Sequence, residues 1–251
     1  INLIKNMKDN VYNVSKLVFH KEKLESLAKE EITAPVYVRI KPTNKCDHHC
    51  SYCSYNPENK CPVSERINPH DEIPREKILE ILSDFRDMRK LDSRGIGVKA
   101  ITYSGGGEPL IYPHIAEAMK KTLEYGIELS TITNGQKLKG EKAEILAQAE
   151  WVRISAGESD SKTFSETRKV PEKWFYELSD NLRNFAKIKK TDCEFGVNFV
   201  VHKGNASQIY SSAKYFKELG LNHIKFTPVY NDHFLEYHKD IRSLAEKQIA
   251  K

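Results

Sequence analysis

The chain has 251 residues, of which 39% are hydrophobic and 30% are charged, with a formal net charge of +5 at pH 7. This composition predicts one large soluble domain that can bury a sizeable core. The longest apolar runs fall far short of the roughly 20 residues needed to cross a bilayer, so we expect no membrane span. Lys and Arg are spread along the chain, which gives nucleic-acid binding little support, although the mild positive charge would suit an anionic substrate or cofactor.

Short β-rich runs alternate with helical patterns along the chain. The expected strands cover residues 36–41, 98–103, 127–133, 151–155, 195–201 and 224–229, and the expected helices cover 75–90, 114–125, 141–148, 172–190 and 206–219. Gly126 and Gly220 are predicted to stop two of the helices. The recurrence of strand, crossover helix and strand predicts an α/β fold with a parallel sheet, closed as a partial (β/α)6 TIM-like barrel. The predicted units are an N-terminal helical extension (1–34), a core barrel (35–229) and a C-terminal helical tail (230–251).

Three cysteines crowd the loop after the first predicted strand. Cys46, Cys50 and Cys53 stand four and three residues apart. Iron–sulfur clusters are held by thiolates, and a [4Fe-4S] cubane usually takes four of them. A cluster held at three corners leaves one iron open, and an open coordination position lets a metal bind and activate a small molecule. The spacing therefore favours a catalytic cubane cluster.

Other interpretations of the cysteines stay open. A zinc site could use the same thiols with His48, His49 or Cys61 as fourth ligand, although structural zinc ligands usually come as two separated pairs. The N-terminus has no apolar secretory segment, so we expect a cytoplasmic protein whose five cysteines stay reduced. Cys61, eight residues after Cys53, is a candidate hydrogen-atom donor or substrate contact. Cys193 starts a strand and is expected to be a small buried residue.

The loops after the next three predicted strands carry polar and glycine-rich residues. These are Gly105-Gly106-Gly107-Glu108-Pro109 after the second strand, Thr133-Asn134-Gly135 after the third, and Ser155 with Gly157 after the fourth. Because the carboxyl ends of parallel strands lie on one rim, these loops should meet the cysteine loop at one site. A glycine-rich loop before a helix could instead hold a phosphate, but the carboxylate of Glu108 would repel it.

These motifs, in this order on successive strands, resemble those of the radical S-adenosylmethionine (SAM) superfamily. The CxxxCxxC signature of that superfamily, with an aromatic residue before its last cysteine, is similar to residues 46–53, and its glycine-glycine-glutamate-proline motif is similar to residues 106–109. The resemblance spans about residues 36–229. It implies a [4Fe-4S] cluster on Cys46, Cys50 and Cys53 whose open iron chelates SAM. One electron would then cleave SAM to a 5′-deoxyadenosyl radical that abstracts hydrogen from a substrate.

The resemblance also implies contacts with SAM. The glycines of residues 105–107 would let the backbone approach the methionine moiety, and Glu108 would accept a hydrogen bond from its ammonium group. In similar enzymes the backbone of the aromatic residue meets the adenine, a polar residue ending the fourth strand meets the ribose or carboxylate, and a later arginine pairs with the carboxylate. The comparable residues are Tyr52, Ser155 and Arg168, with Asn134 and Asn198 on the same rim. Arg168 could instead be a solvated residue of a charged loop at 163–169.

The motifs leave the substrate open. We expect a small molecule, with a sugar or natural-product intermediate as one class. A peptide-modifying enzyme is the alternative, and a zinc-binding scaffold without catalysis is the alternative of another class. The chain has no further CxxC pair for an auxiliary cluster, which weighs against peptide oxidation. The resemblance implies an electron donor such as flavodoxin or ferredoxin.

A local excess of positive charge near the cysteine loop favours an anionic substrate, unless these are solvated surface side chains. The charged residues are Lys41, Lys45, Lys60 and Arg66, offset by Asp47, Glu58 and Glu65.

Overall fold

The computed structural model describes residues 20–59, 65, 67–91, 97–230 and 234–250. Its centre is a six-stranded sheet in which each strand pairs in parallel with the next, in the order β1-β2-β3-β4-β5-β6. The strands are β1 Tyr37–Ile40, β2 Ala100–Tyr103, β3 Glu128–Thr133, β4 Trp151–Ser155, β5 Glu194–Val201 and β6 His223–Pro228. The predicted partial (β/α)6 architecture is confirmed, with the six strands in the expected places.

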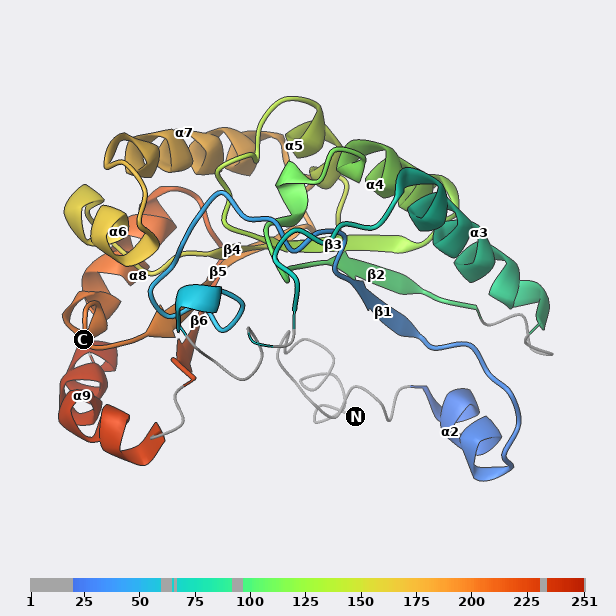
Figure 1. Ribbon diagram of the computed structural model, residues 1–251, viewed down its shortest axis with the longest axis horizontal. Coiled ribbons are helices and arrows are strands. Elements are labelled where there is room, and N and C mark those ends of the chain that lie inside the picture. The colour runs from blue at the N-terminus through green and yellow to red at the C-terminus, as the bar shows by residue number, and fades with distance from the viewer. Residues whose placement is uncertain (1–19, 60–64, 66, 92–96, 231–233, 251) are drawn as a thin grey trace.

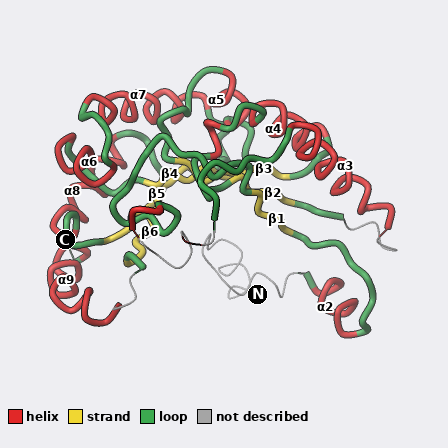
Figure 2. Tube along the Cα trace, in the orientation of Figure 1, coloured by secondary structure: helices red, strands yellow, loops and turns green. Residues whose placement is uncertain are grey.

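The helices are α2 Lys21–Ala28, α3 Arg75–Leu91, α4 Ile115–Glu124, α5 Glu141–Leu146, α6 Ser161–Arg168, α7 Lys173–Ile188, α8 Ile209–Glu218 and α9 Phe234–Ile249, with short 3-10 helices η2 Pro57–Asn59, η4 Pro109–Ile111 and η5 Ala206–Gln208. Helices α3 to α9 cover one side of the sheet, whereas α2 lies apart from them (Figure 1). Figure 1 shows α3 to α9 along an outer arc with the strands inside it. Figure 2 shows, in the same orientation, loop segments in front of the strands. No helix among the described residues is long and apolar enough to cross a membrane.

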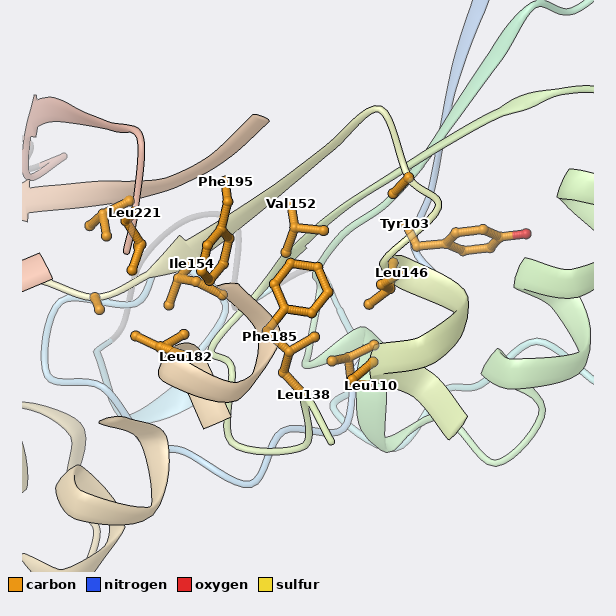
Figure 3. Packing of buried hydrophobic residues seen from close by; sticks show 14 of the residues in the cluster. Tyr103, Leu110, Leu138, Leu146, Val152, Ile154, Leu182, Phe185, Phe195 and Leu221 are labelled. Atoms are coloured by element: carbon orange, nitrogen blue, oxygen red, sulfur yellow. The ribbon is translucent and has the colours of Figure 1, made fainter. Parts of the chain in front are cut away.

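The hydrophobic core lies between the sheet and these helices. In β4, Val152 and Ile154 are buried, and the residues that alternate with them are half-buried. Figure 3 shows these two side chains packed with Phe195 of β5 and with Leu182 and Phe185 of α7. The rings of Phe185 and Phe195 meet edge to face with their centroids 4.8 Å apart. Burial of one such side chain contributes about 1.5–3 kcal/mol, so the alternation fixes which side of each strand faces the helices.

The predicted helix ends at Gly126 and Gly220 are confirmed. Both residues have positive φ angles, 66° and 91°, a conformation in which glycine carries no steric penalty. α2 falls inside the predicted N-terminal extension and α9 inside the predicted tail, while the boundaries between the units stay predictions. The expected amphipathic pattern before residue 20 lies outside the described residues.

One segment differs from the sequence-based expectation. The charged loop expected at residues 163–169 is wrong, because α6 runs through it to Arg168. Asp160 caps the helix by accepting a hydrogen bond from Thr163 N at 2.8 Å, and Lys169 ends it with a φ of 55°. Phe164 is the one large apolar side chain in this helix, so no apolar period signalled it.

Candidate functional site

The loops after the first four strands surround one pocket. Its volume is about 500 Å³, and its lining includes the three cysteines of the first loop, the glycine-rich loop, Asn134 and Ser155. These residues come from four successive strands and were expected on one rim. The structure brings them together as the parallel sheet requires.

The cysteine loop presents three free thiols. Cys46 is exposed, while Cys50 and Cys53 are half-buried. The Asn59 side chain holds the loop by donating to the carbonyls of Cys50 at 3.1 Å and Cys53 at 2.9 Å. Burial raises the pKa of the half-buried Cys50 thiol. Cysteine binds a metal as the thiolate, so binding of a cluster here would release the thiol protons.

The other two cysteines are separate from this group. Cys193 is 1% exposed and precedes β5, which confirms the prediction of a small buried residue. Cys61 lies outside the described residues, so its expected contact with the site stays a prediction.

His48 belongs to the packing of the cysteine loop. It is 5% exposed, and its ring lies 5.9 Å from that of Phe164 and 5.6 Å from that of Trp174, between centroids. Burial lowers the pKa of His48 to about 3. Within the described ranges no group of three His, Cys, Asp or Glu side chains could hold a single metal ion. The zinc alternative stays a prediction, because Cys61, one of its candidate ligands, lies outside these ranges.

The glycine-rich loop packs backbone to backbone against the start of the cysteine loop. Gly107 N donates to the Thr43 carbonyl at 2.9 Å, and Glu108 N donates to the Lys45 carbonyl at 2.8 Å. A Cβ on Gly107 would lie 1.8 Å from the Lys45 oxygen, and one on Gly106 would lie 2.1 Å from Asn44 Oδ1. The close approach of these two loops thus requires glycine at Gly107, where the clash is with backbone, whereas at Gly106 the Asn44 side chain would have to move.

Glu108 ties this loop to the end of β3. Its side chain is 3% exposed; Oε1 accepts from Leu110 N at 2.9 Å and Thr133 Oγ1 at 2.6 Å, and Oε2 accepts from Asn134 N at 2.6 Å. Burial raises the pKa of Glu108 to about 7. A carboxylate offers about four lone-pair sites, so roughly one remains for a further donor. The Asn134 amide continues the link by donating to Asp47 Oδ1 at 2.7 Å.

The arginine expected at the SAM carboxylate is not solvated. Arg168 is 1% exposed and pairs with Glu158, with 3.1 Å between Nε and Oε2. Its Nη2 donates to the Tyr52 hydroxyl at 3.1 Å, and the Tyr52 ring lies 5.3 Å from the ring of His202. Sequence reasoning missed Glu158 and His202, which carry no motif. The alternative of a solvated surface arginine is wrong.

Two further expectations concern polar residues around the rim. Asn198 accepts from Thr227 Oγ1 at 3.3 Å within the sheet, and it is not among the residues that line the pocket. Lys45 lines the pocket and pairs with Glu72 at 3.4 Å, whereas Lys41 donates to the Tyr55 hydroxyl at 2.9 Å. Lys60 and Arg66 lie outside the described residues. Sequence reasoning missed Arg39, an exposed cation of β1 that lines the same pocket.

The pocket suits a ligand with polar groups. Ser104 lines it, is 4% exposed, and its Oγ has no hydrogen-bond partner among the described residues. Buried hydroxyl groups are normally hydrogen-bonded, so this one fits a ligand atom or an ordered water. Together with the three thiols in the lining, this hydroxyl fits a cluster and an amino-acid-like ligand beside it.

Comparison with known proteins gives consistent matches. The model of the Radical SAM superfamily matches residues 40–245. The PqqA peptide cyclase of Streptomyces rochei is 25% identical over 204 residues, covering 79% of this chain and 50% of that protein. An S-adenosylmethionine-dependent nucleotide dehydratase of Lacinutrix mariniflava is 23% identical over 220 residues, covering 79% and 43%. The chain thus spans about half the length of these relatives.

A solved structure shares the fold. Streptococcus suis SuiB bound to S-adenosylmethionine superposes with a TM-score of 0.65 at 20% sequence identity, covering 98% of this chain and 55% of SuiB. At this identity the likeness concerns the fold alone.

Proposed function

Because the chain belongs to the radical SAM superfamily, we propose that it cleaves S-adenosylmethionine reductively at a [4Fe-4S] cluster held by Cys46, Cys50 and Cys53. When bound, the cluster would supply the one electron that reductive cleavage of SAM to methionine and a 5′-deoxyadenosyl radical requires, and that radical would abstract hydrogen from the substrate. A low-potential donor such as flavodoxin or ferredoxin would supply the electron. The observation that carries the proposal is the meeting of three free thiols and the glycine-rich loop at one pocket.

The residues around the thiols would hold SAM. The remaining lone pair of Glu108 would accept from the ammonium group, since the other three acceptor positions are used by the protein. The Ser104 hydroxyl, which has no hydrogen-bond partner among the described residues, also lines the pocket and would meet the methionine moiety. Ser155, at the end of β4, would meet the ribose or carboxylate, and the Tyr52 backbone would meet the adenine. Asn134 would act indirectly, because its amide already holds Asp47.

An anionic small molecule is the substrate class that the pocket favours. Arg39 is exposed in the lining, and it forms no ion pair with another described residue. Among the described residues, Glu108 is the one carboxylate in the lining, and burial raises its pKa, which disfavours its negative charge. A guanidinium group suits phosphate or carboxylate groups through its paired donors. The nucleotide dehydratase among the relatives supports a phosphorylated or nucleotide-linked substrate.

A peptide is the second candidate substrate. It is supported by the similarity to a protein named as a peptide cyclase, and the relatives do not choose between the two classes. Comparing SAM consumption in the presence of phosphorylated sugars and nucleotides with that in the presence of peptides would separate them.

Reconstitution of the cluster tests the proposal. After anaerobic reconstitution the protein should contain about four irons and four sulfides per chain, as expected of a cubane. Cys50→Ala should lose this content and the brown absorbance. Cys193→Ala is the matched control, because Cys193 is buried away from the pocket, and it should keep both. Equal loss in the two variants would contradict the three-ligand assignment.

A further inference from the structure

The end of α6 places a buried ion pair beside the cysteine loop. Arg168 Nε donates to Glu158 Oε2 at 3.1 Å, and each of these side chains is 1% exposed. Burying two charges is costly unless further hydrogen bonds compensate, and a hydrophobic pair of similar volume often packs as well. A charge kept at this depth therefore points to a role beyond packing.

The guanidinium group reaches the cysteine loop through its two outer nitrogens. Arg168 Nη1 lies 3.9 Å from Cys50 Sγ, and Nη2 donates to the Tyr52 hydroxyl at 3.1 Å. The Phe164 ring covers the group, with 5.4 Å between its centroid and the guanidinium carbon. Since Glu158 holds Nε, the planar group has one orientation, and this orientation directs the outer nitrogens at the loop.

The same helix end holds the loop through its main chain. His49 N donates to the Arg168 carbonyl at 3.0 Å, and Ser51 N donates to the Thr167 carbonyl at 2.9 Å. Carbonyls in the last turn of a helix lack partners inside the helix, so these two are available to the loop. Cys50 lies between the two donors. Its backbone is therefore fixed on both sides, while its sulfur meets the guanidinium group.

We propose that Arg168, which also lines the pocket, is a positioning residue that fixes Cys50 and raises the reduction potential of the cluster. This inference rests on the proposed cluster. Reduction adds one negative charge, so a positive hydrogen-bond donor at a cluster sulfur stabilises the reduced state more than the oxidised one. Glu158 limits the effect, because its negative charge offsets that of Arg168 inside the same buried pair.

The test is a redox titration, followed by electron paramagnetic resonance, of reconstituted protein without SAM. Arg168→Gln should shift the potential to more negative values and lower the ratio of reduced to oxidised cluster at a fixed poise about tenfold, which is about 59 mV for one electron. Glu158→Gln keeps the shape but removes the offsetting charge. It should shift the potential in the opposite direction, a pair of signs that a merely structural role would not produce.

A control variant weakens the same helix without touching the loop. Asp160→Ala removes the cap on Thr163 N at the other end of α6, so it should lower stability and leave the potential unchanged. If Arg168→Gln fails to fold, Arg168→Lys replaces it. This variant keeps the positive charge, so its potential should be less than about 59 mV below that of the wild type. Glu158→Gln still has to shift the potential upward.

The outcomes separate this inference from the proposed function. An unchanged potential in Glu158→Gln would overturn the proposal. Unchanged potentials in both variants, together with weaker SAM binding by Arg168→Gln, would overturn it and assign the arginine to SAM binding instead. Wild-type protein that binds no iron would refute the proposed function as well. A wild-type cluster that cleaves SAM, combined with unchanged potentials in the variants, would refute this inference alone.

Discussion

Replacing Glu108 with Ala would test the link between the glycine-rich loop and the end of β3. The change removes the acceptor of Leu110 N, Asn134 N and Thr133 Oγ1. The hydroxyl can rotate to another acceptor, but the two backbone amides cannot. A buried donor without an acceptor costs about 1–3 kcal/mol, so the two amides together predict a loss of about 2–6 kcal/mol in the free energy of unfolding.

The loss of unfolding free energy in Glu108→Ala should depend on pH, because burial raises the pKa of Glu108 from 4.5 to about 7. A folded-state pKa above the unfolded one means that the stability from this group is full below pH 4.5 and is lost as the pH rises through 7. At 1.36 kcal/mol for each pKa unit, the wild-type protein should lose up to about 3 kcal/mol over this window. Glu108→Ala lacks this slope. Its deficit relative to wild type should therefore be larger at pH 5 than at pH 8.

The assay is urea unfolding of the metal-free proteins at both pH values. Thr133→Val is the matched control: it removes one donor to Glu108 and the acceptor of Gly135 N, so it should cost about 1–3 kcal/mol, but it keeps the titrating carboxyl and therefore the sign of the slope. A deficit of Glu108→Ala that stays constant or grows from pH 5 to pH 8 would refute the reasoning. In the reconstituted protein the same variant should keep its iron and bind SAM more weakly.

The other predictions concern the loops and the pocket. Gly107→Ala should destabilise the fold by about 1–3 kcal/mol in urea unfolding, because the new Cβ would meet the Lys45 carbonyl, and a stability equal to wild type would contradict the close packing. Arg39→Gln should raise the KM for an anionic substrate with little change in kcat, and the wild-type KM should rise with salt as charges are screened over about 10 Å at 0.1 M. A KM that changes neither with salt nor in Arg39→Gln would contradict the proposal of an anionic substrate. His48→Phe should keep the iron content, because the ring sits between Phe164 and Trp174, and loss of iron would make His48 a ligand.

Sequence patterns predicted the elements that depend on local periodicity. Val152 and Ile154 alternate in β4 as a strand with one face on the core requires, and Gly126 ends α4 because the chain needs a positive φ there. The cysteine loop and the glycine-rich loop were placed on one rim because parallel strands put their carboxyl ends together.

Contacts between distant segments could not be predicted in this way. Arg168 is buried because its partners are Glu158, ten residues earlier, and Cys50, more than a hundred residues earlier, and no local pattern joins them. The eight residues of α6 are mostly polar, so propensity alone suggested a loop. Glu108 was recognised by its motif, yet its three protein donors come from two segments and appear only when these are folded together.

The most direct measurement of the central claim is the product of SAM in the reduced, reconstituted protein. The account predicts 5′-deoxyadenosine and methionine in equal amounts, formed slowly even without substrate, and neither product from Cys50→Ala. This variant removes one of the three pocket thiols and leaves the glycine-rich loop in place. Formation of S-adenosylhomocysteine as the sole product, or equal 5′-deoxyadenosine from wild type and Cys50→Ala, would contradict it.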